Sequence, residues 1–195
     1  MNVQENYLEK EVQEKIQHLL FSPLMSWTYQ ADSAHLGSKD KYKEVYGVDM
    51  MYQTPSFGCV IVRDGLINVK EPRLKQVIRG LMPLISMNKK KYGLDPNSLQ
   101  RIRLGLHLPT VNKPLHNNPH IDSQDPHVVV LYYVNDVDGD TFFFDEDMNI
   151  TNRVSPKMGK AVMFDGFIRH SSSIPTTGTR ITVNFNYDKK ITEVL

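Results

Sequence analysis

The second half of the sequence contains a series of short runs rich in β-branched and aromatic residues, and this series most constrains the fold. After Asn97 the runs are RIRLGLHL, VVVLYYV, TFFF, KAVMF and RITVNFNY, and segments containing Pro, Gly, Asn and Asp separate them. Residues of these types favour strands, and several short strands at such intervals are typical of a β-sandwich or a small barrel. In the first run apolar and polar residues alternate, which predicts a strand with one buried face. The alternating residues are Ile102, Leu104, Leu106 and Leu108 on one face and Arg101, Arg103, Gly105 and His107 on the other.

The first half of the sequence has a different, helical periodicity. Apolar residues recur there at three- and four-residue steps in two segments, which predicts two helices with one apolar face each. Their apolar residues are Val12, Ile16, Leu19 and Leu20, then Leu74, Val77, Ile78, Leu81 and Leu84. Pro83 predicts a kink or a break in the second helix, because proline removes one hydrogen bond from the helix interior. Between the helices, the run GCVIVRDG predicts a strand.

These patterns together predict one α+β domain that is mainly β. The 195 residues contain no internal repeat and no low-complexity linker, and this length suits a single domain. We expect residues 1–195 to form one domain, in which residues 1–97 supply bracing helices and a strand and residues 98–190 supply most of a β core.

Composition indicates the compartment and the partners of the protein, but not any reaction that it catalyses. The formal net charge is +1, so no global field favours binding to nucleic acid or to an anionic membrane. Cys59 is the only cysteine, which excludes a disulfide within the chain and suits a reducing compartment. The first twenty residues are too charged for a secretory signal, and no apolar run has the ~20 residues that a membrane span needs. We therefore expect a cytoplasmic protein with no membrane partner.

The candidate metal ligands are His120 and Asp122, with His170 far downstream. Side chains two residues apart on a strand point to the same face, so His120 and Asp122 can approach one ion from one direction. Two imidazoles and one carboxylate on one face of an octahedron leave three adjacent positions open, as oxygen-activating Fe(II) sites require. The sequence therefore predicts an iron site at His120, Asp122 and His170, and these three residues are its candidate catalytic residues.

A candidate carboxylate site lies ten residues after His170. Arg180 begins the run RITVNFNY, and Thr182 shares its strand face by alternation. A guanidinium matches a carboxylate with two parallel hydrogen bonds, and a nearby hydroxyl can add a third. We expect Arg180 and Thr182 to bind the acidic end of a cosubstrate.

The stretch from Asn118 to Tyr187 resembles the double-stranded β-helix core of the Fe(II)/2-oxoglutarate oxygenases, in the prolyl-4-hydroxylase-like branch. The matching segments are NPHID, VVVLYYVNDVDGDTFFF and GKAVMFDGFIRHSSSIPTTGTRITVNF. The pattern is also similar to that of small oxygenases encoded by marine bacteriophages. The resemblance implies a jelly-roll core, Fe(II) as the metal, 2-oxoglutarate and O2 as cosubstrates, and hydroxylation of a C–H bond with release of succinate and CO2.

The chain departs from the pattern of prolyl hydroxylases at two points. Many of them carry a cosubstrate-binding tyrosine shortly before H-x-D, whereas LGLHLPTVNKPLHNNP contains none. They usually carry lysine where this chain has Arg180. These departures leave the primary substrate open among a peptidyl proline, a free amino acid, another small metabolite and a modified base.

Other readings of the same residues are less well supported. His116 and His120 have helical spacing for zinc, but Asn117, Asn118 and Pro119 disfavour a helix there. The acidic cluster that begins at Asp136 lacks the glycine and the glutamate of an EF-hand loop, and Asp138-Gly139 indicates a hairpin turn instead. His107 and His127 are expected to be structural. Tyr132 and Tyr133 face opposite sides of their strand, so one of them can reach a pocket.

Two functions of other classes are compatible with a jelly-roll: a non-catalytic, cupin-like metal-binding module, and a structural protein of a virion. A bare binding module has no need of an arginine ten residues beyond its last ligand, and a virion protein has no need of the three ligands. The oxygenase prediction accounts for both features.

Overall fold

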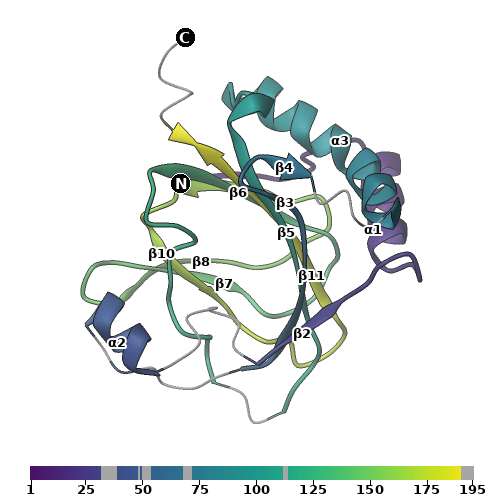
Figure 1. Cartoon of the computed structure of the whole chain (residues 1–195). Coiled ribbons are helices and arrows are strands. Elements are labelled where there is room, and N and C mark those ends of the chain that lie inside the picture. Colours follow the sequence, from purple (N-terminus) through teal and green to yellow (C-terminus); the bar gives the residue numbers. More distant parts are fainter. Residues whose placement is uncertain (32–38, 48, 50–53, 68–71, 112–113, 190–195) are drawn as a thin grey trace.

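The computed structural model describes residues 1–31, 39–47, 49, 54–67, 72–111 and 114–189, and consists of two antiparallel sheets with helices on the outside (Figure 1). The major sheet has the strand order β1-β9-β6-β11-β5-β3-β2, with β4 paired to the edge of β3. Its strands are β1 (Asn2–Gln4), β2 (Thr28–Gln30), β3 (Ser56–Arg63), β4 (Leu66–Ile67), β5 (Leu99–His107), β6 (His127–Tyr133), β9 (Ala161–Asp165) and β11 (Arg180–Asp188). The minor sheet has the order β10-β7-β8, with β7 (Thr141–Phe144), β8 (Ile150–Val154) and β10 (Arg169–Ser172). This mainly β, jelly-roll architecture is the predicted fold class.

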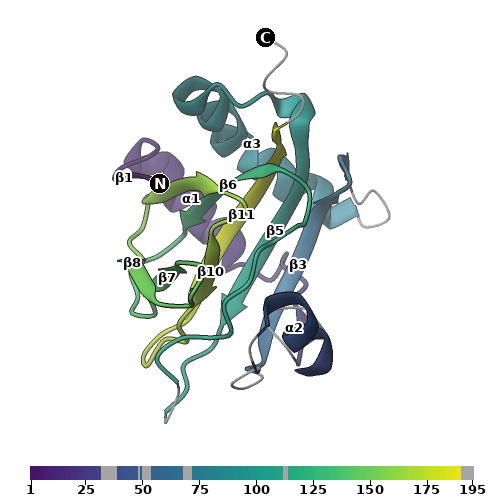
Figure 2. The ribbon, with the colours of Figure 1, turned by 90° about the vertical axis from the view of Figure 1, so that its left-hand side faces the viewer.

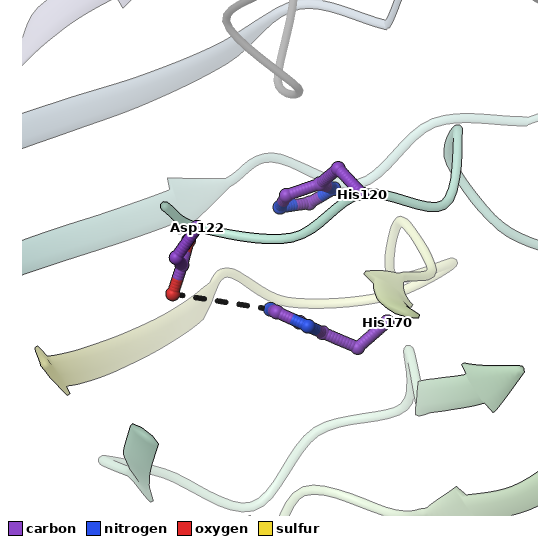
Figure 3. A group of neighbouring side chains, drawn as sticks. All are labelled: His120, Asp122 and His170. Carbon is purple, nitrogen blue, oxygen red and sulfur yellow. Dashed lines mark ion pairs between the residues drawn. The ribbon is translucent and has the colours of Figure 1, made fainter. Parts of the chain in front are cut away.

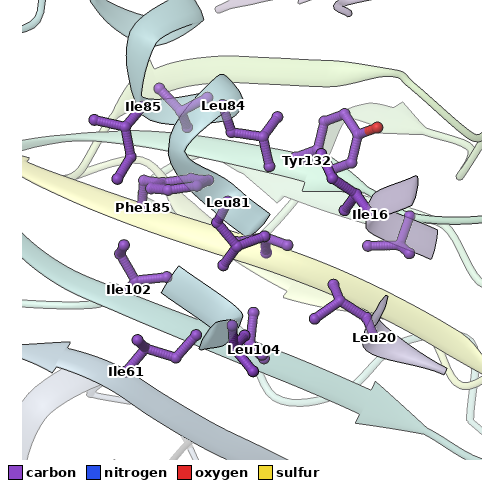
Figure 4. Packing of buried hydrophobic residues seen from close by; sticks show 14 of the residues in the cluster. Ile16, Leu20, Ile61, Leu81, Leu84, Ile85, Ile102, Leu104, Tyr132 and Phe185 are labelled. Atoms are coloured by element: carbon purple, nitrogen blue, oxygen red, sulfur yellow. The ribbon is translucent and has the colours of Figure 1, made fainter. Parts of the chain in front are cut away.

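Two helices cover the outer face of the major sheet. They are α1 (Lys10–Leu20) and α3 (Pro72–Tyr92), and a 3-10 turn, η1 (Pro96–Ser98), leads from α3 into β5. Figure 4 shows their apolar side chains packed on the sheet: Ile16 and Leu20 from α1, Leu81, Leu84 and Ile85 from α3, and Ile61, Ile102, Leu104, Tyr132 and Phe185 from the strands. All of these side chains are almost fully buried, and burial of each contributes roughly 1.5–3 kcal/mol to folding.

The second predicted helix runs through Pro83 without a break. Proline at this position leaves the carbonyl of Arg79 without its helical donor. Arg79 lies on the exposed side of α3, where water can hydrogen-bond to that carbonyl. The predicted break is therefore absent, because Leu81 and Leu84 on the opposite side of the helix stay packed in the core.

A second, smaller core lies between the two sheets. Alternation along β6 places Val129, Leu131 and Tyr133 on the inner face, where they pack against Phe143 of the minor sheet. Tyr132 points the opposite way and joins the core under the helices. Of the two tyrosines that the sequence left open, Tyr133 thus faces the space between the sheets.

Helix α2 (Lys39–Tyr46) lies away from α1 and α3, near the end of β3 (Figure 2), and the sequence did not predict it. Its apolar content is low, and its two buried residues are Tyr42 and Tyr46. The sequence also did not predict β8 or β10, because both are short and contain few apolar residues.

No helix in the described ranges is long and apolar enough to cross a membrane.

Candidate metal centre

The three candidate ligands are brought together where the segment before β6 crosses the start of β10. His120 and His170 form an isolated antiparallel bridge, in which each backbone N–H donates to the other residue's carbonyl at 3.0 Å. The ring centroids of the two histidines lie 4.9 Å apart. One ligand atom from each of His120, Asp122 and His170 lies within 4.8 Å of the others, and Figure 3 shows the three side chains converging.

The hydrogen bonds of both histidines orient the same ring nitrogen toward the group. Nδ1 of His120 lies 3.1 Å from the carbonyl of Asn118, and Nδ1 of His170 lies 3.0 Å from the carbonyl of Ile168. A proton on each Nδ1 satisfies these carbonyls and leaves the Nε2 lone pairs free for a metal. Burial lowers the pKa of both histidines, and for His120, which also faces His170, the value falls to about 4. Both imidazoles are therefore neutral at pH 7, as metal ligation requires.

Asp122 is held by three polar side chains. Its Oδ2 accepts hydrogen bonds from Nδ2 of Asn184 at 2.8 Å and of Asn186 at 3.1 Å, and its Oδ1 lies 2.6 Å from the Arg101 guanidinium. Burial acts to raise the pKa of Asp122, but the nearby Arg101 charge and the other partners hold it well below its ordinary value. The carboxylate is thus charged and fixed, with Oδ2 4.0 Å from Nε2 of His170.

The predicted carboxylate-binding residues lie on the same face of β11 as the two asparagines. Alternation places Arg180, Thr182, Asn184 and Asn186 in one row that faces the minor sheet. Arg180 is 2% exposed, its Nε donates to the carbonyl of Gly139 at 2.8 Å, and its Nη2 donates to Oγ1 of Thr141 at 2.9 Å. Within the described residues no carboxylate forms an ion pair with this guanidinium.

Tyr133 and His107 complete the surroundings of Arg180. The Arg180 guanidinium lies 5.7 Å from the centre of the Tyr133 ring, and the Tyr133 hydroxyl donates to Thr141 Oγ1 at 2.8 Å. His107 is the cross-strand partner of Arg180 on β5. Its Nδ1 is enclosed without a hydrogen-bond partner in the described part of the chain, and burial beside Arg180 lowers its pKa to about 3. His107, expected to be structural, therefore lies beside the candidate carboxylate site as a neutral imidazole.

A cleft of about 670 Å³ lies at the opposite end of this row and borders the metal centre at Asp122. Its walls include Arg101, Arg103, Asp122 and Asn186, whereas Arg180 and Thr182 do not line it. The sequence analysis did not assign Arg101, Arg103, Asn184 or Asn186 to the site. The alternation that paired Arg180 with Thr182 also contains the two asparagines, and Arg101 and Arg103 form the polar side of the predicted strand RIRLGLHL.

The other histidines considered in the sequence lie outside the group. His116 is not helical, and its ring packs against Phe142 and Phe144. His127 is buried, with Nδ1 2.7 Å from the carbonyl of Asp125. Asp138 accepts hydrogen bonds from Thr176, and Gly139 has the expected positive φ of +101°. The predicted hairpin is absent, because β6 and β7 on either side of this segment lie in different sheets.

No protein-family model matches the sequence, and no curated protein matches it. Solved structures do match the fold. An oxidoreductase of the 2OG-Fe(II) oxygenase family from Burkholderia pseudomallei aligns with a TM-score of 0.63 and 12% identity, over 94% of this chain and 82% of that one. A prolyl hydroxylase from Trichoplax adhaerens, in complex with a peptide fragment of the hypoxia inducible factor oxygen degradation domain, aligns with a TM-score of 0.57 and 14% identity, over 98% and 84%.

A third match is the non-heme alpha-ketoglutarate dependent epimerase SnoN from nogalamycin biosynthesis, with a TM-score of 0.57 and 13% identity, over 95% of this chain and 76% of that one. At such identities the likeness establishes the fold. The chain has the fold of the 2OG-Fe(II) oxygenases, in agreement with the resemblance seen in its sequence.

Proposed function

We propose that the protein is an Fe(II)- and 2-oxoglutarate-dependent dioxygenase that hydroxylates a C–H bond and releases succinate and CO2. The observation that carries this proposal is the convergence of two neutral imidazoles and one charged carboxylate within 4.8 Å of one another. This donor set fits Fe(II) in a site with open positions. The shared fold supports the proposal independently of the ligands.

Each residue of the centre has a distinct part in the proposed reaction. His120, Asp122 and His170 would hold the iron, and bound iron would supply the activation of dioxygen. The carbonyls of Asn118 and Ile168 keep the imidazoles in the ligating tautomer. Asn184, Asn186 and Arg101 fix the direction of the Asp122 carboxylate before a metal arrives.

Arg180 and Thr182 are proposed to bind the distal carboxylate of 2-oxoglutarate. A buried guanidinium without a carboxylate partner is costly unless an anionic ligand compensates its charge. Asn184, which contacts Asp122, lies four residues after Arg180 on the same face of β11, about 14 Å along the strand. Thr182 lies between them. The Thr141 hydroxyl accepts hydrogen bonds from Arg180 and Tyr133, so its own proton can be donated to the same carboxylate.

The test of the metal centre is anaerobic loading with Fe(II) and 2-oxoglutarate, monitored by the visible charge-transfer absorption of the chelate. We expect the band in the parent protein and its loss in Asp122→Ala, together with loss of succinate formation. Asp147→Ala, an exposed acid in the turn after β7, should retain both. A parental rate of succinate formation in Asp122→Ala would exclude Asp122 as a ligand.

The test of the carboxylate site is the affinity for 2-oxoglutarate. A charge-assisted contact contributes about 1.5–3 kcal/mol, so Arg180→Ala should raise the dissociation constant roughly 10- to 150-fold. Arg180→Lys should recover part of the loss, and the exposed Arg79→Ala on α3 should cause none. Titration of the charge-transfer band measures these values, and an unchanged constant in Arg180→Ala would remove Arg180 from the site.

A further inference from the structure

The cleft at the Asp122 end of the centre has a charge pattern that the proposed function does not explain. Its volume of about 670 Å³ is within the range of small-molecule sites. Asp122 lies in its wall, whereas His120 and His170 do not, so the cleft meets the candidate metal centre at Asp122. Arg180 lies at the other end of the row on β11, so the cleft and the candidate cosubstrate site are separate places.

Arg103 is a cation of this cleft that forms no ion pair with a carboxylate in the described part of the chain. Its Nη2 donates to Oε1 of Gln30 at 2.7 Å, and its Nε is enclosed without a hydrogen-bond partner among the described residues. Arg101, two residues away on the same face, is by contrast paired with Asp122. Burial and the neighbouring Arg101 charge lower the pKa of Arg103 to about 10, so it remains a cation at pH 7.

The cross-strand partner of Arg103 is also unsatisfied. Asn184 lies opposite Arg103 on β11, and its amide donates to Asp122, but its Oδ1 is enclosed without a partner in the described ranges. A buried donor and a buried acceptor, side by side and both unpaired, are costly unless a ligand satisfies them.

The rim of the cleft carries three acids and one exposed base, Arg63, so its charge is negative on balance. Asp64 and Asp125 line it and are exposed, and Asp188 lines it as well. These acids disfavour a ligand with several negative charges, such as a phosphate ester, and favour one that carries a cationic group beside a single anion.

We propose that this cleft binds the primary substrate of the enzyme, and that this substrate is a small amino-acid-like zwitterion whose carboxylate pairs with Arg103. The ammonium group faces the acids of the rim. This inference rests on the proposed oxygenase function, since it names the substrate class of the same centre.

The experiment observes Arg103 directly in the metal-free protein. The Nε–H resonances of 15N-labelled arginine side chains are recorded by NMR, and Arg103 is assigned with Arg103→Gln. The common L-amino acids are titrated in pairs with their carboxamides, which keep the ammonium group and lack the carboxylate. We expect at least one amino acid to shift the Arg103 signal, and its carboxamide to bind roughly 10- to 100-fold more weakly.

Matched variants separate the cleft from other arginines. Arg103→Gln should weaken binding of that amino acid, measured by calorimetry, by a similar factor, and the exposed Arg79→Gln on α3 should leave it unchanged. Equal binding of acid and amide, or no shift with any amino acid, overturns the proposal. A shift of Arg103 by 2-oxoglutarate larger than that by any amino acid overturns it too, because the cleft would then hold the cosubstrate.

Turnover links the cleft to the reaction and keeps the two proposals apart. With Fe(II) and 2-oxoglutarate, the same amino acid should raise succinate release above the rate without it, and its carboxamide should not. Absence of the charge-transfer band in the parent protein counts against the oxygenase function, whatever Arg103 does. An intact band, with Arg103 unmoved by every amino acid, overturns the substrate inference alone.

Discussion

Asp122 owes its charge and its direction to residues from two strands of the major sheet. Arg101 on β5 and the two asparagines on β11 reach the carboxylate from one side, and Asn186 also accepts a hydrogen bond from Nε of Arg101 at 2.9 Å. Partners of this kind hold a ligand in place before the metal binds, and their loss typically costs 10–100-fold in metal affinity.

Asn186→Ala should therefore weaken metal binding while leaving all three candidate ligands in the chain. We expect the dissociation constant for Mn(II), used as a redox-stable probe, to rise roughly 10- to 100-fold. Calorimetric titration measures it. Asn152→Ala, on the exposed strand β8, serves as the control and should bind Mn(II) like the parent. Equal affinity in both variants would show that Asn186 does not position Asp122.

Helix α2 supports the metal centre, because its tyrosine side chains form hydrogen bonds with the backbone around His120 and Asp122. The Tyr42 hydroxyl donates to the carbonyl of Pro119 at 2.6 Å, and the backbone N–H of Ile121 donates to the Tyr46 hydroxyl at 2.9 Å. The guanidinium of Arg169, next to His170, lies 5.8 Å from the centre of the Tyr46 ring. The helix thus holds the segment between His120 and Asp122, which belongs to no strand of either sheet.

Tyr46→Phe should loosen this segment by removing the acceptor of the Ile121 N–H. An unsatisfied buried donor costs about 1–3 kcal/mol, so the free energy of unfolding should fall by that amount. Urea denaturation measures the loss, and amide hydrogen exchange of Ile121 should become faster. Tyr29→Phe removes a hydroxyl from a side chain that is 61% exposed, and should change neither quantity. Parental exchange at Ile121 in Tyr46→Phe would contradict a positioning role for α2.

At the scale of the whole molecule, three histidines between the two sheets are neutral in the folded protein: His107, His120 and His170. Burial lowers the pKa of His107 to about 3 and that of His120 to about 4, and it also lowers the pKa of His170. In the unfolded chain a histidine has a pKa of about 6.5. Between these values the unfolded chain binds more protons than the folded protein, so acidification favours unfolding.

The metal-free protein should accordingly lose stability as the pH falls from about 6.5 toward 3, and should keep its full stability above that window. Each buried histidine contributes at most about 1.4 kcal/mol per pH unit to the slope. His107→Asn should reduce the slope by up to this amount, whereas His18→Asn, on the exposed side of α1, should not. Urea denaturation between pH 7 and pH 4.5 measures the slopes, and identical slopes in all three proteins would refute the prediction.

Much of the fold follows from local patterns in the sequence. The run GCVIVRDG formed β3, and the runs after Asn97 formed β5, β6, β7, β9 and β11. Both predicted helices formed, as α1 and α3. Strand β10 was missed although it carries His170, because Arg169–Ser172 is stabilised by pairing with β7 rather than by its own propensities. Helix α2 was missed for a similar reason, since its two buried tyrosines contact a segment more than seventy residues away.

The sequence alone determined which side chains share a strand face, because alternation is a property of the local backbone: Arg180 with Thr182 and the two asparagines, and Arg101 with Arg103. It could not determine what covers each face. Only the packing of the minor sheet and α2 against the major sheet turned the polar side of β5 inward, brought His170 to His120, and left Arg103 at the wall of a cleft. Contacts of this kind join residues far apart in the chain, and they are decided by which layers bury the most apolar surface together, a quantity that no short stretch of sequence contains.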